Sequence, residues 1–379
     1  MTAEADRLDD RLSVGDLWGG FEGSDPDLMA AGWLPPGPRV AAFEAAFAAA
    51  QGVTNGVAAS NCMTALHLAL LVAGVRPGDE VVVPSLSFAT TAHAPRHVGA
   101  DPVFADVDPQ TGNVTASTIA AVLGPRTRAV VVADHGGLPV DIGPIAELCE
   151  DHGIALVEDA SFAVGSRYRG HPVGVGADVT AWSFLPRRAL RTGEGGLLTT
   201  DCLASAQQAR RLRQHSDLGF TFRMTDIQAA IGLVQLRRLP AMVARRRALA
   251  TVYREALEGV PGLRLVEDPR EGESNYQSFW AEIGDEFPLS RDELRGALAA
   301  EGIPVGTGVR AAHREPDFAD CPLRVPLPAT ERLSARTLTF PLDHELGESG
   351  VLRVCDAIRR TRVHGCGQQT EEARGGIPT

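Results

Sequence analysis

Short apolar runs alternate with longer amphipathic stretches from about residue 55 to residue 200. The apolar runs predict six strands, at 80–84, 102–106, 129–133, 155–158, 179–184 and 196–200. Between them, stretches such as 64–73 and 142–152 have the 3.6-residue period of helices. Strands that alternate with helices predict a mostly parallel sheet covered by helices on both faces. Ligands of such sheets bind at the carboxyl ends of strands and at helix N-termini, so we look for functional residues there.

A long helical stretch follows this region. Thr225 and Gln228 have the spacing of a capping box, which predicts a helix over 226–250. Pro240 lies inside this stretch, and proline removes a helical hydrogen bond. We therefore expect the helix to be kinked or split at Pro240.

Strand and helix patterns alternate again after the long helix. A strand is expected at 278–283 and a helix at 291–301, which together indicate a smaller α/β unit. The last residues are polar and rich in glycine, a composition typical of disorder. The expected organisation is an N-terminal segment, a large domain, a small C-terminal domain and a disordered tail, at 1–30, 31–245, 246–362 and 363–379.

Composition places the chain among ordinary globular proteins and excludes several classes. It has 379 residues, of which 44% are hydrophobic and 22% charged. No run is apolar enough for a membrane span, and the acidic N-terminus is unlike a secretory signal, so we expect a cytoplasmic protein. The net charge of −12 argues against nucleic acid as a partner. The six cysteines form no CxxC pair, so we expect neither a metal site nor a disulfide framework.

The basic residues have one unusual property. All 36 basic side chains are arginine, and the chain contains no lysine. A bias towards Ala, Gly, Arg and Pro explains few lysines better than none at all. The chain therefore lacks the only amine side chain that can form a Schiff base.

A series of motifs identifies a resemblance over residues 30–362. In chain order they are GWLPPGP at 32–38, SNCMTALHLAL at 60–70, GVRPGDEVVVPSLSFATTAHA at 74–94, PVFADVDP at 102–109, GPRTRAVV at 124–131, ALVEDAS at 155–161, WSFLPRRALRTGEGG at 182–196 and GFTFRMTDIQAAIGLVQL at 219–236. With them the chain resembles the DegT/DnrJ-type sugar aminotransferases of the fold type I pyridoxal phosphate (PLP) superfamily. The resemblance implies a large domain with a mostly parallel seven-stranded sheet between helices, and a smaller C-terminal α/β domain.

The resemblance also implies where a cofactor pocket would lie. Six of its positions fall on Cys62, Met63, Thr64, Phe88, Asp159 and Ser183. Residues 62–64 open a helix at the phosphate site, where backbone N–H groups attract an anion. Phe88 is placed against the pyridine ring, and Ser183 contacts the phosphate. Asp159 falls where a carboxylate keeps the pyridine nitrogen protonated.

The chain departs from the family pattern at the nucleophile. The family places its Schiff-base lysine six residues before Glu194, and that position is Arg188. A guanidinium stays protonated above pH 12 and is a poor nucleophile. Arg188 therefore cannot form the internal aldimine, so no cofactor is expected to be bound covalently.

Three further departures surround this one. Phe162 stands where the family has a glutamine near the cofactor's ring hydroxyl, and Met63 where a small hydroxyl residue meets the phosphate. Thr221 stands where an asparagine reaches the phosphate across the dimer interface. Together these changes suggest a pocket no longer shaped for PLP. Each residue also has a plainer interpretation, since aromatic residues and methionine fill cores and Asp159 can cap backbone N–H groups.

The first hypothesis is a repurposed enzyme that works without PLP. Arg188 would hold an anionic small molecule in the old cofactor cleft, with acid–base chemistry from Asp134, His135 or Asp159. Family context suggests the biosynthesis of a deoxyaminosugar or another secondary metabolite.

Three alternatives remain open. The chain is a non-catalytic subunit that pairs with an active paralogue, or it binds PLP or pyridoxamine phosphate (PMP) noncovalently. In the third alternative, Arg188 replaces the lysine of an active sugar aminotransferase and inactivates it. The family builds its sites at dimer interfaces, so the resemblance implies a homodimer or a heterodimer with a paralogue.

Overall fold

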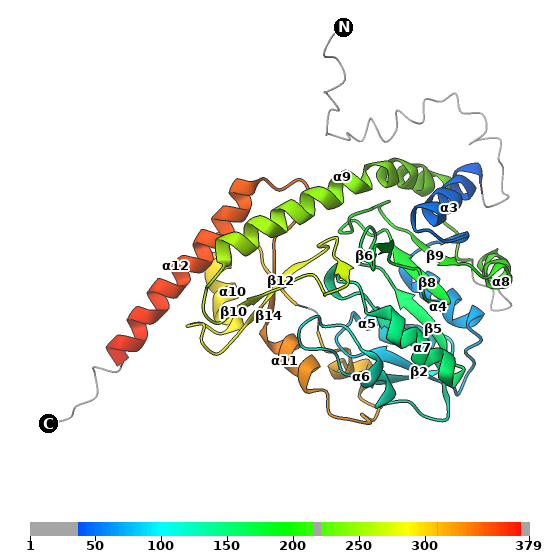
Figure 1. Ribbon diagram of the computed structural model, residues 1–379, viewed down its shortest axis with the longest axis horizontal. Coiled ribbons are helices and arrows are strands. Elements are labelled where there is room, and N and C mark those ends of the chain that lie inside the picture. The colour runs from blue at the N-terminus through cyan, green and yellow to red at the C-terminus, as the bar shows by residue number, and fades with distance from the viewer. Residues whose placement is uncertain (1–36, 215–220, 309, 373–379) are drawn as a thin grey trace, which may run out of the picture.

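A computed structural model describes residues 37–214, 221–308 and 310–372 (Figure 1). Side chains are described up to Thr361. The predicted N-terminal segment 1–30 lies outside these residues.

The larger sheet has seven strands in the order β1-β9-β8-β5-β4-β2-β3. Its strands are β1 (Asn55–Ala59), β2 (Glu80–Pro84), β3 (Asp101–Ala105), β4 (Thr127–Ala133), β5 (Ala155–Asp159), β8 (Val179–Ser183) and β9 (Gly196–Thr200). Neighbouring strands from β3 through β8 pair in parallel, and β9 pairs antiparallel with both β8 and β1. The predicted mostly parallel sheet is confirmed. Strand β1 was not predicted from the sequence.

Both faces of this sheet are buried, because alternate side chains along each strand join different cores. In β2, Val82 belongs to one core cluster, whereas Val81 and Val83 belong to another. The covering helices are α3 (Pro38–Ala50), α4 (Cys62–Val72), α5 (Ala89–His97), α6 (Ala116–Ala120), α7 (Ile142–His152) and α8 (Leu203–Gln214).

The long helix α9 (Asp226–Leu257) is continuous. The Thr225 hydroxyl accepts the N–H of Gln228 at 3.3 Å, which confirms the predicted cap. Of the two expectations at Pro240, the split is wrong, and the kink stays a prediction. Pro240 is exposed, so water can hydrate the carbonyl that its missing N–H leaves unpaired. Packing against α3 near one end and α12 (Glu348–Glu372) near the other stabilises the helix on both sides of the proline (Figure 1).

The C-terminal part forms a second, smaller α/β unit. Its antiparallel sheet has the order β10-β12-β14-β13, with β10 (Leu263–Leu265), β12 (Phe279–Ile283), β13 (Gly306–Thr307) and β14 (Thr337–Phe340). Helices α10 (Arg291–Ala300), α11 (Pro328–Arg336) and α12 accompany it, with the 3₁₀ turns η2 (Ala312–Arg314) and η3 (Pro316–Phe318). A third sheet joins β11 (Gly272–Glu273) to β6 (Arg167–Tyr168) and β7 (His171–Pro172). The domain limit predicted between 245 and 246 falls inside α9 and stays a prediction.

Helix α12 extends to Glu372, so the backbone is helical where the polar composition had predicted disorder. Residues such as Val351 and Ile358 bury this helix in the core, and helix formation propagates from that anchored part. The predicted tail at 373–379 lies outside the described residues. No helix of the described part of the chain is long and apolar enough to cross a membrane.

Candidate active-site cleft

Two carboxylates lie where neighbouring parallel strands end. Asp159 is the last residue of β5 and is in register with Ala133, the last residue of β4. The N–H of Asp134 donates to the carbonyl of Asp159 at 3.3 Å. The sheet thus brings Asp134 and Asp159 to one edge, as the sequence predicted.

Asp159 is buried and already holds two hydrogen bonds. The Thr91 hydroxyl donates to Oδ2 at 2.7 Å, and the N–H of Ser161 donates to Oδ1 at 3.1 Å. Both contacts fix the orientation of the carboxylate. The expected capping of a backbone N–H is therefore confirmed, whereas the place of Asp159 in a cofactor pocket stays a prediction.

The predicted phosphate site is the start of α4. The Asn61 side chain accepts the N–H of Thr64 at 2.9 Å, and the Thr64 hydroxyl returns to the Asn61 carbonyl at 2.8 Å. This cap does not use the N–H groups of Cys62 and Met63. They lie in the first turn of the helix, where backbone amides lack partners within the helix. A Cβ on Gly196 would lie 2.2 Å from the Asn61 carbonyl oxygen, so only glycine allows β9 to approach this turn.

Two polar side chains of the candidate site lack hydrogen-bond partners among the described residues. Ser183 at the end of β8 is fully buried, and its Oγ has no hydrogen-bond partner among the described residues. The Nε of Arg188 is likewise buried without an acceptor within the described part of the chain. Both atoms are therefore available to a partner outside the described residues.

Arg188 forms one layer of a three-layer stack. Its guanidinium carbon lies 3.8 Å from the centroid of the Phe162 ring. The other partner of that ring is Phe88, with centroids 5.4 Å apart and planes inclined by 24°. Burial lowers the pKa of Arg188 from its ordinary value, whereas the charges of Cys62 and Asp159 raise it.

The side chains as placed do not fit a PLP ring stacked in the family manner. Phe162 stacks on Phe88 and so competes with a pyridine ring for this side chain, which is 48% exposed. Arg188 covers Phe162 and brings a cation where an uncharged amine would be needed. Met63 packs against the neighbouring core, and Thr221 is exposed. We therefore derive no reaction step through PLP.

His135 lies apart from this stack. Its ring packs edge-on against Trp280 with centroids 5.7 Å apart, and a Cβ on Gly112 would lie 2.7 Å from it. Burial lowers the pKa of His135 to about 4, so the ring is neutral near pH 7. The ring therefore packs as a neutral side chain between Trp280 and Gly112, and a catalytic role for His135 stays a prediction.

Asp134 is buried next to another carboxylate. Its Oδ1 accepts the N–H of Val140 at 2.9 Å, and its Oδ2 has no partner among the described residues. Burial raises the pKa of Asp134 well above its ordinary value, and the neighbouring Glu158 raises it further. Glu158, whose charge contributes to this rise, was not singled out by the sequence analysis.

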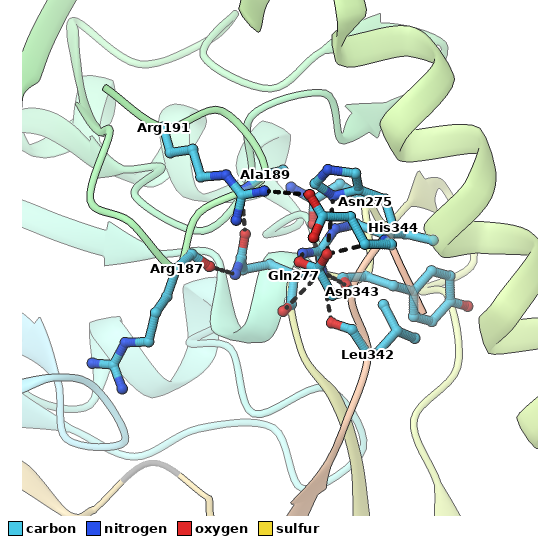
Figure 2. A network of polar contacts seen from close by, with 11 residues as sticks. Arg187, Ala189, Arg191, Asn275, Gln277, Leu342, Asp343 and His344 are labelled. Atoms are coloured by element: carbon cyan, nitrogen blue, oxygen red, sulfur yellow. Dashed lines mark hydrogen bonds and ion pairs between the residues drawn. The ribbon is translucent and has the colours of Figure 1, made fainter. Parts of the chain in front are cut away.

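The sequence analysis also missed residues that hold the Arg188 loop. Gln277, which precedes β12, contacts the backbone on both sides of Arg188 (Figure 2). The only available signal was the polar run at 274–278 before an apolar strand.

Asp343, His344 and Glu345 offer ligand atoms within 4.8 Å of one another. Arg246 pairs with Asp343 at 2.9 Å, and Arg191 pairs with Glu345 at 3.1 Å (Figure 2). The carboxylates of Asp343 and Glu345 form ion pairs with arginines, and we assign no metal to them.

The fold defines the class of protein. A seven-stranded, mostly parallel sheet with a smaller C-terminal α/β unit is the architecture of the fold type I PLP aminotransferases, and solved aminotransferases share it. The model of the DegT/DnrJ/EryC1/StrS aminotransferase family matches residues 26–359. The chain belongs to this family of sugar aminotransferases, as its motifs had indicated.

Relatives match over nearly their whole length. The chain is 34% identical over 370 residues to the dTDP-4-dehydro-2,3,6-trideoxy-D-glucose 4-aminotransferase of Saccharopolyspora spinosa, covering 91% of this chain and 94% of that one. The aminotransferase TlmJ of Streptoalloteichus hindustanus is 38% identical, with a TM-score of 0.82 over 91% of this chain and 95% of that one. DesV of S. venezuelae, solved with a ketimine intermediate, is 32% identical, with a TM-score of 0.85 over 92% and 95%.

Proposed function

We propose that this chain binds an anionic small molecule of the nucleotide-sugar class, noncovalently and without a lysine imine. It would act in the biosynthesis of a deoxyaminosugar or another secondary metabolite, as a PLP-independent member of its family. The observation that carries this proposal is Arg188, a cation with a buried unpaired Nε in place of the lysine.

The cleft offers donors that suit an anion. Arg188 uses the face of its guanidinium on Phe162, which leaves the N–H groups at its edge for a phosphate or carboxylate. The buried Oγ of Ser183 and the first turn of α4 add uncharged donors. Arg187 is exposed beside Arg188 and adds positive charge.

The ligand class follows from the relatives. The Saccharopolyspora spinosa enzyme acts on a dTDP-linked sugar, as its name states. A diphosphate linkage carries negative charges that can pair with the Arg188 guanidinium. We infer that the chain still recognises a sugar nucleotide but no longer transfers an amino group. This would explain why the fold is retained although the nucleophile has changed.

The test is a binding titration on the purified protein with dTDP, PLP and PMP as separate probes. We expect dTDP to bind, and Arg188→Gln to weaken it at least tenfold, about 1.4 kcal/mol. Arg211→Gln, at an exposed arginine of α8, is the matched control and should change nothing. Equal dTDP affinity in the wild type and Arg188→Gln would overturn the proposal. Tight PMP binding with no dTDP binding would favour the noncovalent vitamin B6 alternative instead.

One observation favours the partner-subunit alternative. Phe88 is 48% exposed at the edge of the stack, although aromatic side chains of this size are usually covered. A second chain would cover it if the cleft lies at a dimer interface. Co-expression with a lysine-bearing paralogue, followed by mass measurement in solution, separates a heterodimer from a homodimer.

A further inference from the structure

Gln277 brackets the peptide units on either side of Arg188. Its side-chain oxygen accepts the N–H of Ala189 at 2.9 Å, and its Nε2 donates to the carbonyl of Arg187 at 2.6 Å. Figure 2 shows this carboxamide reaching the loop from the strand side. One side chain thus fixes the backbone immediately before and after the arginine.

The neighbouring Asn275 holds the other half of the stack. Its Nδ2 donates to the carbonyls of Phe162 at 2.8 Å and Val164 at 2.9 Å. Its Oδ1 accepts the backbone N–H of Gln277 at 2.7 Å, so the Asn275 carboxamide is linked to the backbone of Gln277. Residues 275–277 therefore anchor the backbones of both Phe162 and Arg188.

This anchoring segment is itself held rigidly. The buried Arg246 of α9 donates to the carbonyls of Tyr276 at 3.1 Å and Leu342 at 3.2 Å. Tyr276 has a φ of 47°, a strained value for a residue that is not glycine. Strain of this kind persists only where surrounding contacts impose it.

A loop that is held in place only for stability does not need its hydrogen bonds to be concentrated around one residue. Arg191 in the same loop is held separately by Glu345 through an exposed ion pair. Gln277, by contrast, acts on the two peptide units next to Arg188, and Asn275 acts on the residue that Arg188 covers. The contacts converge on the relative placement of guanidinium and ring.

We propose that Gln277 is a positioning residue that fixes Arg188 over Phe162 and thereby sets the affinity of the cleft for an anion. The affinity part of this inference rests on the proposed function, whereas the geometric part does not. Arg188 is then preorganised, and a ligand does not have to order it on binding.

The first experiment is a double-mutant cycle on dTDP affinity, with Gln277→Ala, Arg188→Gln and the double variant. We expect Gln277→Ala to weaken dTDP binding five- to tenfold with Arg188 present, and less than twofold with Arg188→Gln. The matched control is Gln207→Ala, which makes the same change at an exposed position of α8 and should leave affinity unaltered. Equal losses in both backgrounds would mean that Gln277 does not act through Arg188.

The second experiment reads the geometry without a ligand. In protein labelled with ¹³C,¹⁵N-arginine, the Nε–H signal of Arg188 is identified by its loss in Arg188→Gln. A proton over an aromatic face is shifted upfield by the ring current, so Phe162→Leu should move this signal downfield. Gln277→Ala should move it at least halfway to that position.

Gln277→Glu is a second variant that keeps the test valid if the alanine variant misfolds. Glutamate keeps the acceptor for Ala189 but loses the donor to Arg187, so an intermediate shift is expected in a folded protein. An unchanged Nε–H signal in both variants would overturn the proposal. If the signal moves but Arg188→Gln leaves dTDP affinity unchanged, the positioning role stands and the proposed function fails.

Discussion

The guanidinium of Arg188 lies 3.8 Å from the centre of the Phe162 ring, so the two changed positions of the pocket contact each other. A lysine at 188 with the family's glutamine at 162 would make no such contact. A partly buried cation–π contact of this kind contributes about 1–2 kcal/mol. The two substitutions therefore support each other, and reversing one should leave the other unsuited to its surroundings.

We predict that Arg188→Lys alone restores little vitamin B6 binding. Phe162 would still stack on Phe88 and compete with a pyridine ring for that aromatic surface. The double variant Arg188→Lys with Phe162→Gln should bind PLP at least tenfold more tightly and give a red-shifted imine band. Titration of PLP followed by visible absorbance measures both. If the single variant performs as well as the double one, the alternative of a simply inactivated aminotransferase gains instead.

A buried ion pair links α3 to α8. Arg213 and Glu44 are nearly fully buried, and both contact the backbone of Ala58 in β1. Arg213→Met should lower the free energy of unfolding by about 3–5 kcal/mol, because it leaves a buried carboxylate unpaired. Urea unfolding measures this loss.

The companion to this prediction is the double variant Arg213→Met with Glu44→Leu. It removes both charges, so it should recover a large part of the lost stability. If the double variant is no more stable than the single one, the loss comes from packing and not from the unpaired charge. dTDP affinity should not change in either variant, since neither residue contacts the cleft.

The strands and the cleft could be predicted to different degrees. Strands such as β2 carry their own signal, because a run of β-branched residues bounded by charge and proline is buried on both faces. Asp159 and Arg188 could be located because motifs fix them in the sequence. Gln277 could not, since its role depends on a contact across 88 residues that no local pattern encodes.

Pro240 and α12 show the converse limit. Local rules predicted a break at the proline and disorder in the tail, and both rules concern an isolated chain. Packing of α9 against α3 and α12 outweighs the tendency of the proline to split the helix. Helix propagation from the buried part of α12 outweighs the polar composition of the tail.

We predict that His135 does not exchange protons with the ligand. His135→Gln should change dTDP affinity less than twofold, in contrast to Arg188→Gln. It should also flatten the acid side of the stability profile. The pKa of His135 is near 4 when folded and near 6.5 when unfolded, so the unfolded chain binds the extra proton between these values. Wild-type stability therefore falls as pH falls from 6.5 to 4, and this part of the slope should be missing in the variant. The control His171→Gln, at an exposed position, should keep the wild-type slope.

Glu158 gives a pH dependence of the opposite sign. Burial first, and then the charge of Asp159, raise its pKa from 4.5 to about 7, although the Thr180 hydroxyl acts against this shift. Between pH 4.5 and 7 the folded chain keeps a proton that the unfolded chain releases, so stability falls as pH rises through this window and is constant above it. Glutamine has the same shape as the protonated acid and can still accept the Thr180 hydroxyl.

Glu158→Gln should therefore be more stable than the wild type at pH 8, by about 1–3 kcal/mol, and equal to it near pH 4.5. Urea unfolding at pH 4.5, 6, 7 and 8 measures the difference. Glu150→Gln, at an exposed position of α7, is the control and should follow the wild type at every pH. A constant difference across the series would show that the carboxylate of Glu158 is already ionised at pH 4.5, which would contradict the burial-driven rise of its pKa.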